Sequence, residues 1–240
     1  MNLPGRLAAL AAASLALVVA VLFASFAIRL GQAVEGFPIG PIRVVHRVTA
    51  SLEVLTMLGV LWLAWRARAH SPVLARAAAV AAAITVFLSI LGILAGQNPP
   101  PAAALGNLLA GLALAASFAW ILGRSRRGPT RRPLAHLVAI LLAAQCLLGA
   151  WISIFAIELW TLPLFLHGIV GSAIACGAAW LGLRCDQALP RFALLGLALA
   201  VPAAGFASAL FGQPLGATLA HAAVAALLAA AAGYAHARLA

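Results

Sequence analysis

The chain has 240 residues, of which 65% are hydrophobic and only 8% are charged, whereas charged residues make up about 25% of a typical soluble domain. The fifteen basic residues are all arginines, against four acidic residues, and the formal net charge is +11. These values exclude a soluble globular domain, a disordered chain and a disulfide scaffold. They also argue against nucleic-acid binding, because the arginines lie between long apolar runs that leave no polar binding face.

Eight apolar stretches are each long enough to cross a bilayer, which takes about 20 residues. They use most of the chain, so any chemistry must take place between helices or in short connectors. The first stretch lacks an evident small-residue cleavage site, and we expect a mature helix rather than a signal peptide. The sequence predicts an all-α integral membrane protein with eight transmembrane helices. The expected spans are 6–29, 42–65, 73–95, 101–123, 134–156, 161–184, 191–211 and 215–237.

The arginines predict the orientation of these helices. With the N-terminus inside, twelve of the fifteen fall on the inner side, and only Arg29, Arg43 and Arg47 fall on the outer side. Because cytoplasmic connectors are enriched in basic residues, we expect both termini to be cytoplasmic in the plasma membrane of a bacterium. The three cysteines do not form an outer pair, so a structural disulfide is not expected.

The most polar segment, residues 124–133, lies in the middle of the chain, and five of its ten residues are arginines. We expect it to be a cytoplasmic linker between an N-terminal four-helix half, 1–123, and a C-terminal four-helix half, 134–240. Because each half contains an even number of helices, the two halves would be parallel bundles, related by an axis along the membrane normal.

The two halves share a pattern of polar residues in the same order and at the same depth. His46 in the first half aligns with His167 in the second, and Asn107 aligns with His221. Each half also has a Gly-Gln pair, followed closely by proline, before its last helix. This agreement indicates an internal repeat of four helices.

Three of the six histidines lie one to two turns inside the outer ends of even-numbered helices, namely His46, His167 and His221. At 1.5 Å per residue, this corresponds to a depth of roughly 6–10 Å. Polar groups inside spanning helices are costly and usually functional. A structural hydrogen-bonding role is the alternative for any single buried histidine. The occurrence of His167 and His221 together in one half favours a shared ligand.

Neutral imidazole binds iron, copper and zinc. A zinc or copper site usually needs further cysteine, histidine or carboxylate ligands, and the second half offers only Glu158, in an outer connector. Bis-histidine ligation of haem needs two imidazoles on facing helices with apolar walls. The residues around His167 and His221 are small and mostly apolar, which suits a flat ring but also ordinary helix packing. Haem b is therefore the simplest ligand for this pair.

In the first half, the matching positions are His46 and Asn107, and an amide is a poor iron ligand. Arg43 and Arg47 flank His46 and can pair with haem propionates. The alternative is that they extend to lipid headgroups. Glu53 lies on nearly the same helix face as His46, about 10 Å deeper. Such a carboxylate is protonated, paired with arginine or part of a proton path, and the sequence leaves these alternatives open.

These features resemble the heme A synthase family of cytochrome oxidase assembly proteins, over essentially the whole chain. That family has eight helices in two halves, with a histidine near the outer side of each even-numbered helix. His46-Arg47 is similar to its first His-Arg pair, and Gln145–Gly149 to its Gln-x-x-Leu-Gly stretch. The resemblance implies a haem b cofactor on His167 and His221, and an N-terminal half that oxidises the methyl group of haem O toward haem A. The partners that it suggests are membrane lipid, haem O synthase and cytochrome oxidase assembly factors.

Three features differ from the family pattern. Asn107 replaces the fourth-helix histidine, Arg43 replaces a glutamate one turn before the first histidine, and the outer cysteine pair is missing. Since that glutamate is the family's expected catalytic group, Glu35 or Glu53 would have to replace it as the catalytic acid. Two functions follow: an enzyme that oxidises haem O, or a non-catalytic haem b or electron-transfer protein on the same scaffold. A transporter, the third interpretation, would account for the repeat but not for three histidines at one depth.

Overall fold

The computed structural model describes residues 3–95, 99–125, 133–155, 161–185 and 187–239. Within these ranges, the regular secondary structure consists of eight α-helices, which confirms the predicted all-α membrane fold. Every helix end lies within three residues of its predicted position, and the largest differences are at Leu3, Ile39 and Ala188. The helices are α1 (Leu3–Gly31), α2 (Ile39–Arg66), α3 (Pro72–Ala95), α4 (Pro101–Ser125), α5 (Pro133–Ile154), α6 (Leu162–Leu183), α7 (Ala188–Leu210) and α8 (Leu215–Leu239).

Prolines mark the starts of three helices, because Pro72, Pro101 and Pro133 are the first residues of α3, α4 and α5. Proline suits this position, since its fixed φ is helical and the first N–H of a helix has no partner within the helix. Between α7 and α8 the chain turns at Gly212 and Gln213, whose φ values are 72° and 60°. Glycine adopts this left-handed conformation without strain, which allows a short connection.

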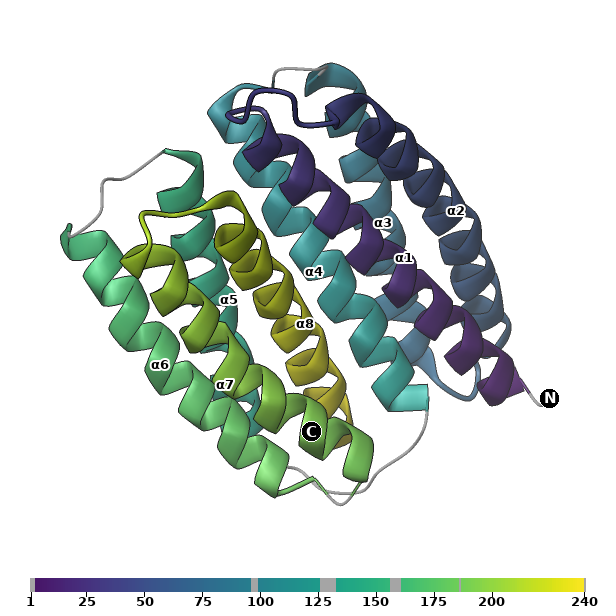
Figure 1. Ribbon diagram of the computed structural model, residues 1–240. Helices are drawn as coiled ribbons and strands as arrows, with labels where there is room; N and C mark the ends of the chain where they lie inside the picture. Colours follow the sequence, from purple (N-terminus) through teal and green to yellow (C-terminus); the bar gives the residue numbers. More distant parts are fainter. Residues whose placement is uncertain (1–2, 96–98, 126–132, 156–160, 186, 240) are drawn as a thin grey trace.

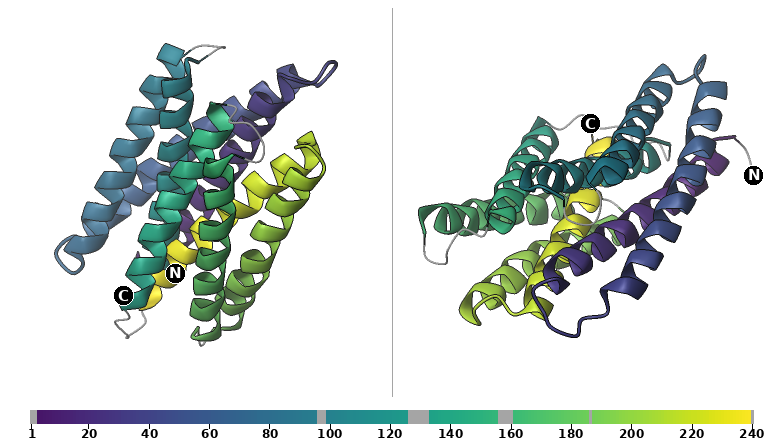
Figure 2. Two further views of the ribbon diagram at one scale, coloured as in Figure 1. Left: turned by 90° about the vertical axis from the view of Figure 1, so that its left-hand side faces the viewer. Right: turned by 90° about the horizontal axis from the view of Figure 1, so that it is seen from above.

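The helices form two four-helix bundles (Figure 1). In the first bundle, α1 and α3 each pack against α2 and α4, and in the second, α5 and α7 each pack against α6 and α8. Helices α2 and α4 are therefore diagonal partners, as are α6 and α8. Figure 2 shows the two ends of the chain at the same end of the bundles, as an even number of membrane crossings requires.

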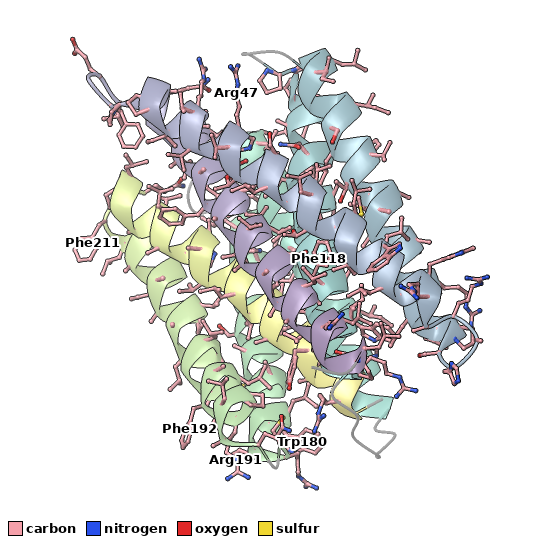
Figure 3. The ribbon with its side chains drawn as sticks, turned by 90° about the vertical axis from the view of Figure 1, so that its right-hand side faces the viewer. Arg47, Phe118, Trp180, Arg191, Phe192 and Phe211 are labelled. Atoms are coloured by element: carbon pink, nitrogen blue, oxygen red, sulfur yellow. The ribbon has the colours of Figure 1, made fainter. Side chains whose placement is uncertain are left out.

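Each bundle has its own apolar core, and the outer surface is also apolar. Phe118 is fully buried in the first core (Figure 3), and Leu194 is fully buried in the second. In contrast, Ile93, Leu94 and Leu189 are largely exposed. All eight helices are long and apolar enough to cross a membrane, so these exposed side chains are expected to contact lipid. The chain is therefore a multi-pass membrane protein.

Helix α8 belongs to the second bundle but also packs against α1 and α4 of the first. A methyl group added at Gly123 would lie 2.7 Å from the backbone oxygen of Tyr234, and one added at Gly233 would lie 3.0 Å from that of Ala116. Small residues let helix backbones approach closely in membranes. The two bundles are thus joined by a backbone-to-backbone contact between α4 and α8.

Arginine–tryptophan pairs lie at one end of the bundles. The guanidinium of Arg66 is 5.1 Å from the ring centroid of Trp62, and that of Arg184 is 4.7 Å from the ring of Trp180. Tryptophan and arginine are typical anchors at membrane interfaces, where the cation also interacts with the aromatic ring. Arg47 lies at the opposite end from Trp180 (Figure 3). The described residues thus include a cationic and aromatic layer at the end that the arginine bias predicts to be cytoplasmic.

Candidate functional site

His167 and His221 approach each other across the second bundle. His167 lies in the second turn of α6 and His221 in the second turn of α8, the diagonal pair of helices. The centroids of the two imidazole rings are 6.1 Å apart, and their planes are inclined by 82°. The structure thus brings together the two residues that the sequence predicts to share a ligand.

The spacing of the rings can be compared with metal–imidazole geometry. An imidazole nitrogen binds a transition metal ion at about 2.0–2.1 Å, so two rings on opposite sides of one ion have centroids about 6 Å apart. The observed separation of 6.1 Å fits this arrangement. Among the described residues, no group of three or more histidine, cysteine, aspartate or glutamate side chains could hold a metal ion. The pair thus supplies two imidazoles, fewer ligands than a tetrahedral zinc or copper site uses.

The His221 ring is held by α7. Its Nδ1 lies 3.0 Å from the backbone oxygen of Val201, and because a carbonyl only accepts, Nδ1 carries the proton and Nε2 has a free lone pair. A methyl group added at Gly205 would lie 2.9 Å from Cε1 of His221, so the ring lies directly against the α7 backbone. A hydrogen bond of 2.9 Å between Ser208 and Thr218 joins the same two helices. His221 is thus oriented as metal-binding histidines commonly are.

The His167 ring is held by α5. Nε2 of Gln145 lies 2.8 Å from Nδ1 of His167 and 2.5 Å from the backbone oxygen of the same residue. Methyl groups added at two glycines would clash with this arrangement: one at Gly149 would lie 2.7 Å from Cε1 of His167, and one at Gly171 would lie 2.6 Å from Nε2 of Gln145. His167 is therefore fixed through both its ring and its backbone.

Gln145 also determines which ring nitrogen of His167 carries the proton. An amide nitrogen only donates, so in this arrangement Nδ1 accepts and Nε2 carries the proton. Ligation of a metal through Nε2 requires the proton to be on Nδ1 instead. Oε1 of Gln145 is buried and, within the described part of the chain, has no hydrogen-bond partner. Rotation of the amide would let this oxygen accept a hydrogen bond from Nδ1–H.

In the first bundle, the residues that match His167 and His221 do not form a comparable contact. His46 lies in α2 and Asn107 in α4, which are diagonal partners, but no hydrogen bond or ring contact between these two described residues is present. Arg43 is half-buried, and Arg47 is exposed at the end of the bundle opposite Trp180 (Figure 3). The structure therefore places the two arginines beside His46 along α2.

The two candidate catalytic acids are far apart. Glu35 is exposed in the connector between α1 and α2, whereas Glu53 is buried in the middle of α2. Glu53 is fourteen residues beyond Ile39, the start of that helix, which corresponds to about 20 Å along the axis. The structure does not bring these acids together, and Glu158 lies outside the described residues.

Several residues of the site were not assigned a role from the sequence. Gln145, Gly149 and Ser153 follow one another at intervals of four in α5, which places them on one helix face. Ser153 accepts a hydrogen bond of 2.9 Å from Arg29 of α1, so a guanidinium from the first bundle lies near the end of the helix that holds His167. The four-residue spacing of these polar and small residues in an apolar helix is a sequence pattern that could have indicated their shared face.

An apolar recess lies between α4 and α5 and has a volume of about 320 Å³. Its lining residues are Leu105, Ala144, Leu147, Leu148 and Trp151. These side chains contain no imidazole, thiol or carboxylate, so the recess offers no metal ligand. No protein-family model and no curated protein matches the chain, so the functional assignment depends on the residues and contacts described above.

Proposed function

We propose that the protein binds haem b in the membrane, with His167 and His221 as the two axial ligands. The observation that carries this proposal is the 6.1 Å separation of their ring centroids across the diagonal of the second bundle. The hydrogen bond from Nδ1 of His221 to Val201 supports it, because metal-binding histidines usually donate their second N–H to a nearby acceptor. When bound, haem would supply a one-electron redox centre at this place.

The wider function that we propose is that of a heme A synthase-like protein in the bacterial plasma membrane, with both termini cytoplasmic. Haem O would be its substrate in the first bundle, where His46 would be the single strong ligand and Asn107 would leave the opposite iron face open. Arg43 and Arg47 would pair with the propionates. Membrane lipid would surround the helices, and haem O synthase and cytochrome oxidase assembly factors would be the protein partners.

The alternative is a non-catalytic haem b or electron-transfer protein on the same scaffold. The placement of the acids favours this alternative, since Glu35 is exposed in the connector between α1 and α2 and Glu53 lies seven residues beyond His46 in α2, about 10 Å along the helix axis. Incubation of the purified protein with haem O, reductant and oxygen, followed by chromatography of the extracted haem, separates the two functions. Hydroxylated haem O or haem A indicates the enzyme, and unchanged haem O indicates the non-catalytic protein.

Replacing either His167 or His221 by alanine is expected to remove the low-spin, bis-histidine absorption spectrum of the haem-loaded protein, because each ring supplies one axial bond. His70→Ala is the matched control, since His70 is exposed in the connector between α2 and α3 and should leave the spectrum unchanged. Absorption and electron paramagnetic resonance spectra of the purified variants make the measurement. A normal spectrum in both site variants would show that the ligands lie elsewhere.

Replacing Gln145 by leucine is expected to lower haem affinity about 10- to 100-fold, the usual effect of losing the group that orients a metal-binding histidine. Gln145→Glu should restore the orientation and lower the haem reduction potential, because a carboxylate acceptor makes the imidazole more basic. Haem titration and potentiometry measure these effects. Gln32→Leu, at an exposed connector position, is the control. Unchanged affinity in Gln145→Leu would contradict the role given to this amide.

A further inference from the structure

Glu53 is a carboxyl group buried at the middle of the membrane-spanning part of the first bundle. The residue is only 5% exposed, and its Oε1 has no hydrogen-bond partner among the described residues. It is fourteen residues from Ile39 and thirteen from Arg66, the two ends of α2, and thus about 20 Å from either end. The polar neighbour of the carboxyl is the side chain of Thr85 on α3.

The threonine hydroxyl groups near Glu53 are placed to donate hydrogen bonds to backbone oxygens. Thr85 donates its hydroxyl proton to the backbone oxygen of Ala81, at 3.1 Å. While its proton is used in that bond, the Thr85 hydroxyl can only accept at its contact with Glu53. Thr56 donates to the backbone oxygen of Glu53 at 2.9 Å and accepts from Ser14 at 2.9 Å. With these bonds formed, the proton at the contact between Glu53 and Thr85 comes from the carboxyl itself.

Among the described residues, no ion pair balances an ionised Glu53. The helices packed against α2 are α1 and α3, and within their described residues and those of α2 no ion pair with Glu53 is formed. Their charged and titratable side chains lie toward the helix ends, and these are Arg6, Arg29, Arg43, His46, Arg47, Arg66 and Arg76. An unpaired carboxylate at this depth carries a large desolvation penalty, which the neutral acid avoids.

We propose that Glu53 is a proton-binding site in the first bundle, held as a neutral carboxylic acid that donates its hydrogen bond to Oγ1 of Thr85. This site lies among α1, α2 and α3 and does not depend on haem binding at His167 and His221. A protonatable group at mid-membrane is the feature that proton-coupled membrane proteins use to carry protons between the two sides. The ligand of this site is thus a proton, and a sodium ion is the competing ligand that the experiment must separate.

Infrared difference spectroscopy of the wild-type protein against Glu53→Gln tests this proposal. At about pH 7.5, exposed carboxyl groups are ionised because glutamate titrates near 4.3. The wild type should then show the carbonyl stretch of a protonated acid, shifted in deuterium oxide and missing from Glu53→Gln. Glu35→Gln is the matched control, because Glu35 is exposed and should not contribute to this band. Absence of the band from the wild type overturns the proposal, and so does its removal when sodium chloride replaces choline chloride.

Thr85→Val provides a second test that does not require the Glu53 variant to fold. Valine removes the hydrogen-bond acceptor while nearly keeping the shape of threonine, so the acid band should move to a higher frequency, as expected for a carbonyl stretch in a weaker hydrogen bond. Ser117→Ala, on the exposed side of α4, is the control for loss of a membrane hydroxyl. An unchanged band position in Thr85→Val would show that Thr85 is not the acceptor and would overturn the assigned geometry.

Discussion

Replacing Gly149 by alanine is expected to abolish the low-spin spectrum proposed for the haem on His167 and His221. The new methyl group would lie 2.7 Å from Cε1 of His167, closer than two such carbon atoms can approach. The ring cannot simply slide away, because Gln145 contacts both its Nδ1 and the backbone oxygen of the same residue. Since metal–ligand distances tolerate only about 0.2 Å of change, we expect haem affinity to fall by about 100-fold, the upper end for a disturbed ligand.

Replacing Gly205 by alanine is expected to disturb His221 in the same way. A methyl group at Gly205 would lie 2.9 Å from Cε1 and 3.0 Å from Nδ1 of His221, and it would displace the ring from the carbonyl of Val201. Gly168→Ala on α6 and Gly196→Ala on α7 are matched controls, because a methyl group at either position meets no atom within 4 Å beyond its chain neighbours and the adjacent backbone of its own helix. Haem titration and absorption spectra should show weakened binding in the Gly149 and Gly205 variants and normal binding in the two controls. Normal haem binding in all four would show that the rings do not lie against these glycines.

Replacing Gly123 by alanine is expected to lower the free energy of unfolding by about 1–3 kcal/mol, the usual cost of overpacking. The added methyl group would lie 2.7 Å from the backbone oxygen of Tyr234 and 2.9 Å from Cβ of Ala237. Neither atom can rotate away as the end of a long side chain could, so α4 and α8 would have to separate. Unfolding in mixed micelles, followed by circular dichroism, measures the change.

The control substitutions for Gly123 should not lower the free energy of unfolding. Gly92→Ala in α3 and Gly216→Ala in α8 place a methyl group where no atom lies within 4 Å. Alanine is favoured over glycine in a helix interior by about 1 kcal/mol, so these variants should be as stable as the wild type or more stable. If Gly123→Ala is stabilised to the same extent, the close approach of α4 and α8 does not exist in the membrane.

The helices could be predicted because the membrane imposes a simple length rule. Each apolar run had to be long enough to cross the bilayer, and charges, prolines and glycines mark where each run ends. This is why α4 was predicted to begin at Pro101 and does so. The differences at Leu3, Ile39 and Ala188 are helices that begin three residues before their predicted starts.

The candidate site was predictable only in part. The shared depth of His167 and His221 could be read from their distance to the helix ends, and the structure places them together. The residues that surround the two rings could not be predicted, because they depend on how each helix is rotated about its axis. Hydropathy does not distinguish Gly149 from Gly168, yet only at Gly149 would an added methyl group meet an imidazole of another helix. The protonation state that Gln145 imposes on His167 likewise depends on the contact between two helices.

Helix α8 carries one of the paired imidazoles and also packs into the core of the first bundle. Leu219 and Ala222, on either side of His221, pack against that core, and Ala226 is part of it. Any ligand that shifts or tilts α8 through His221 would therefore move side chains that stabilise the other half. Communication between the halves is then reciprocal, since two sites that bias the same helix must alter each other's affinity by the same factor. If each half binds a ligand, as we propose, α8 is the element through which one ligand could alter the affinity for the other without direct contact.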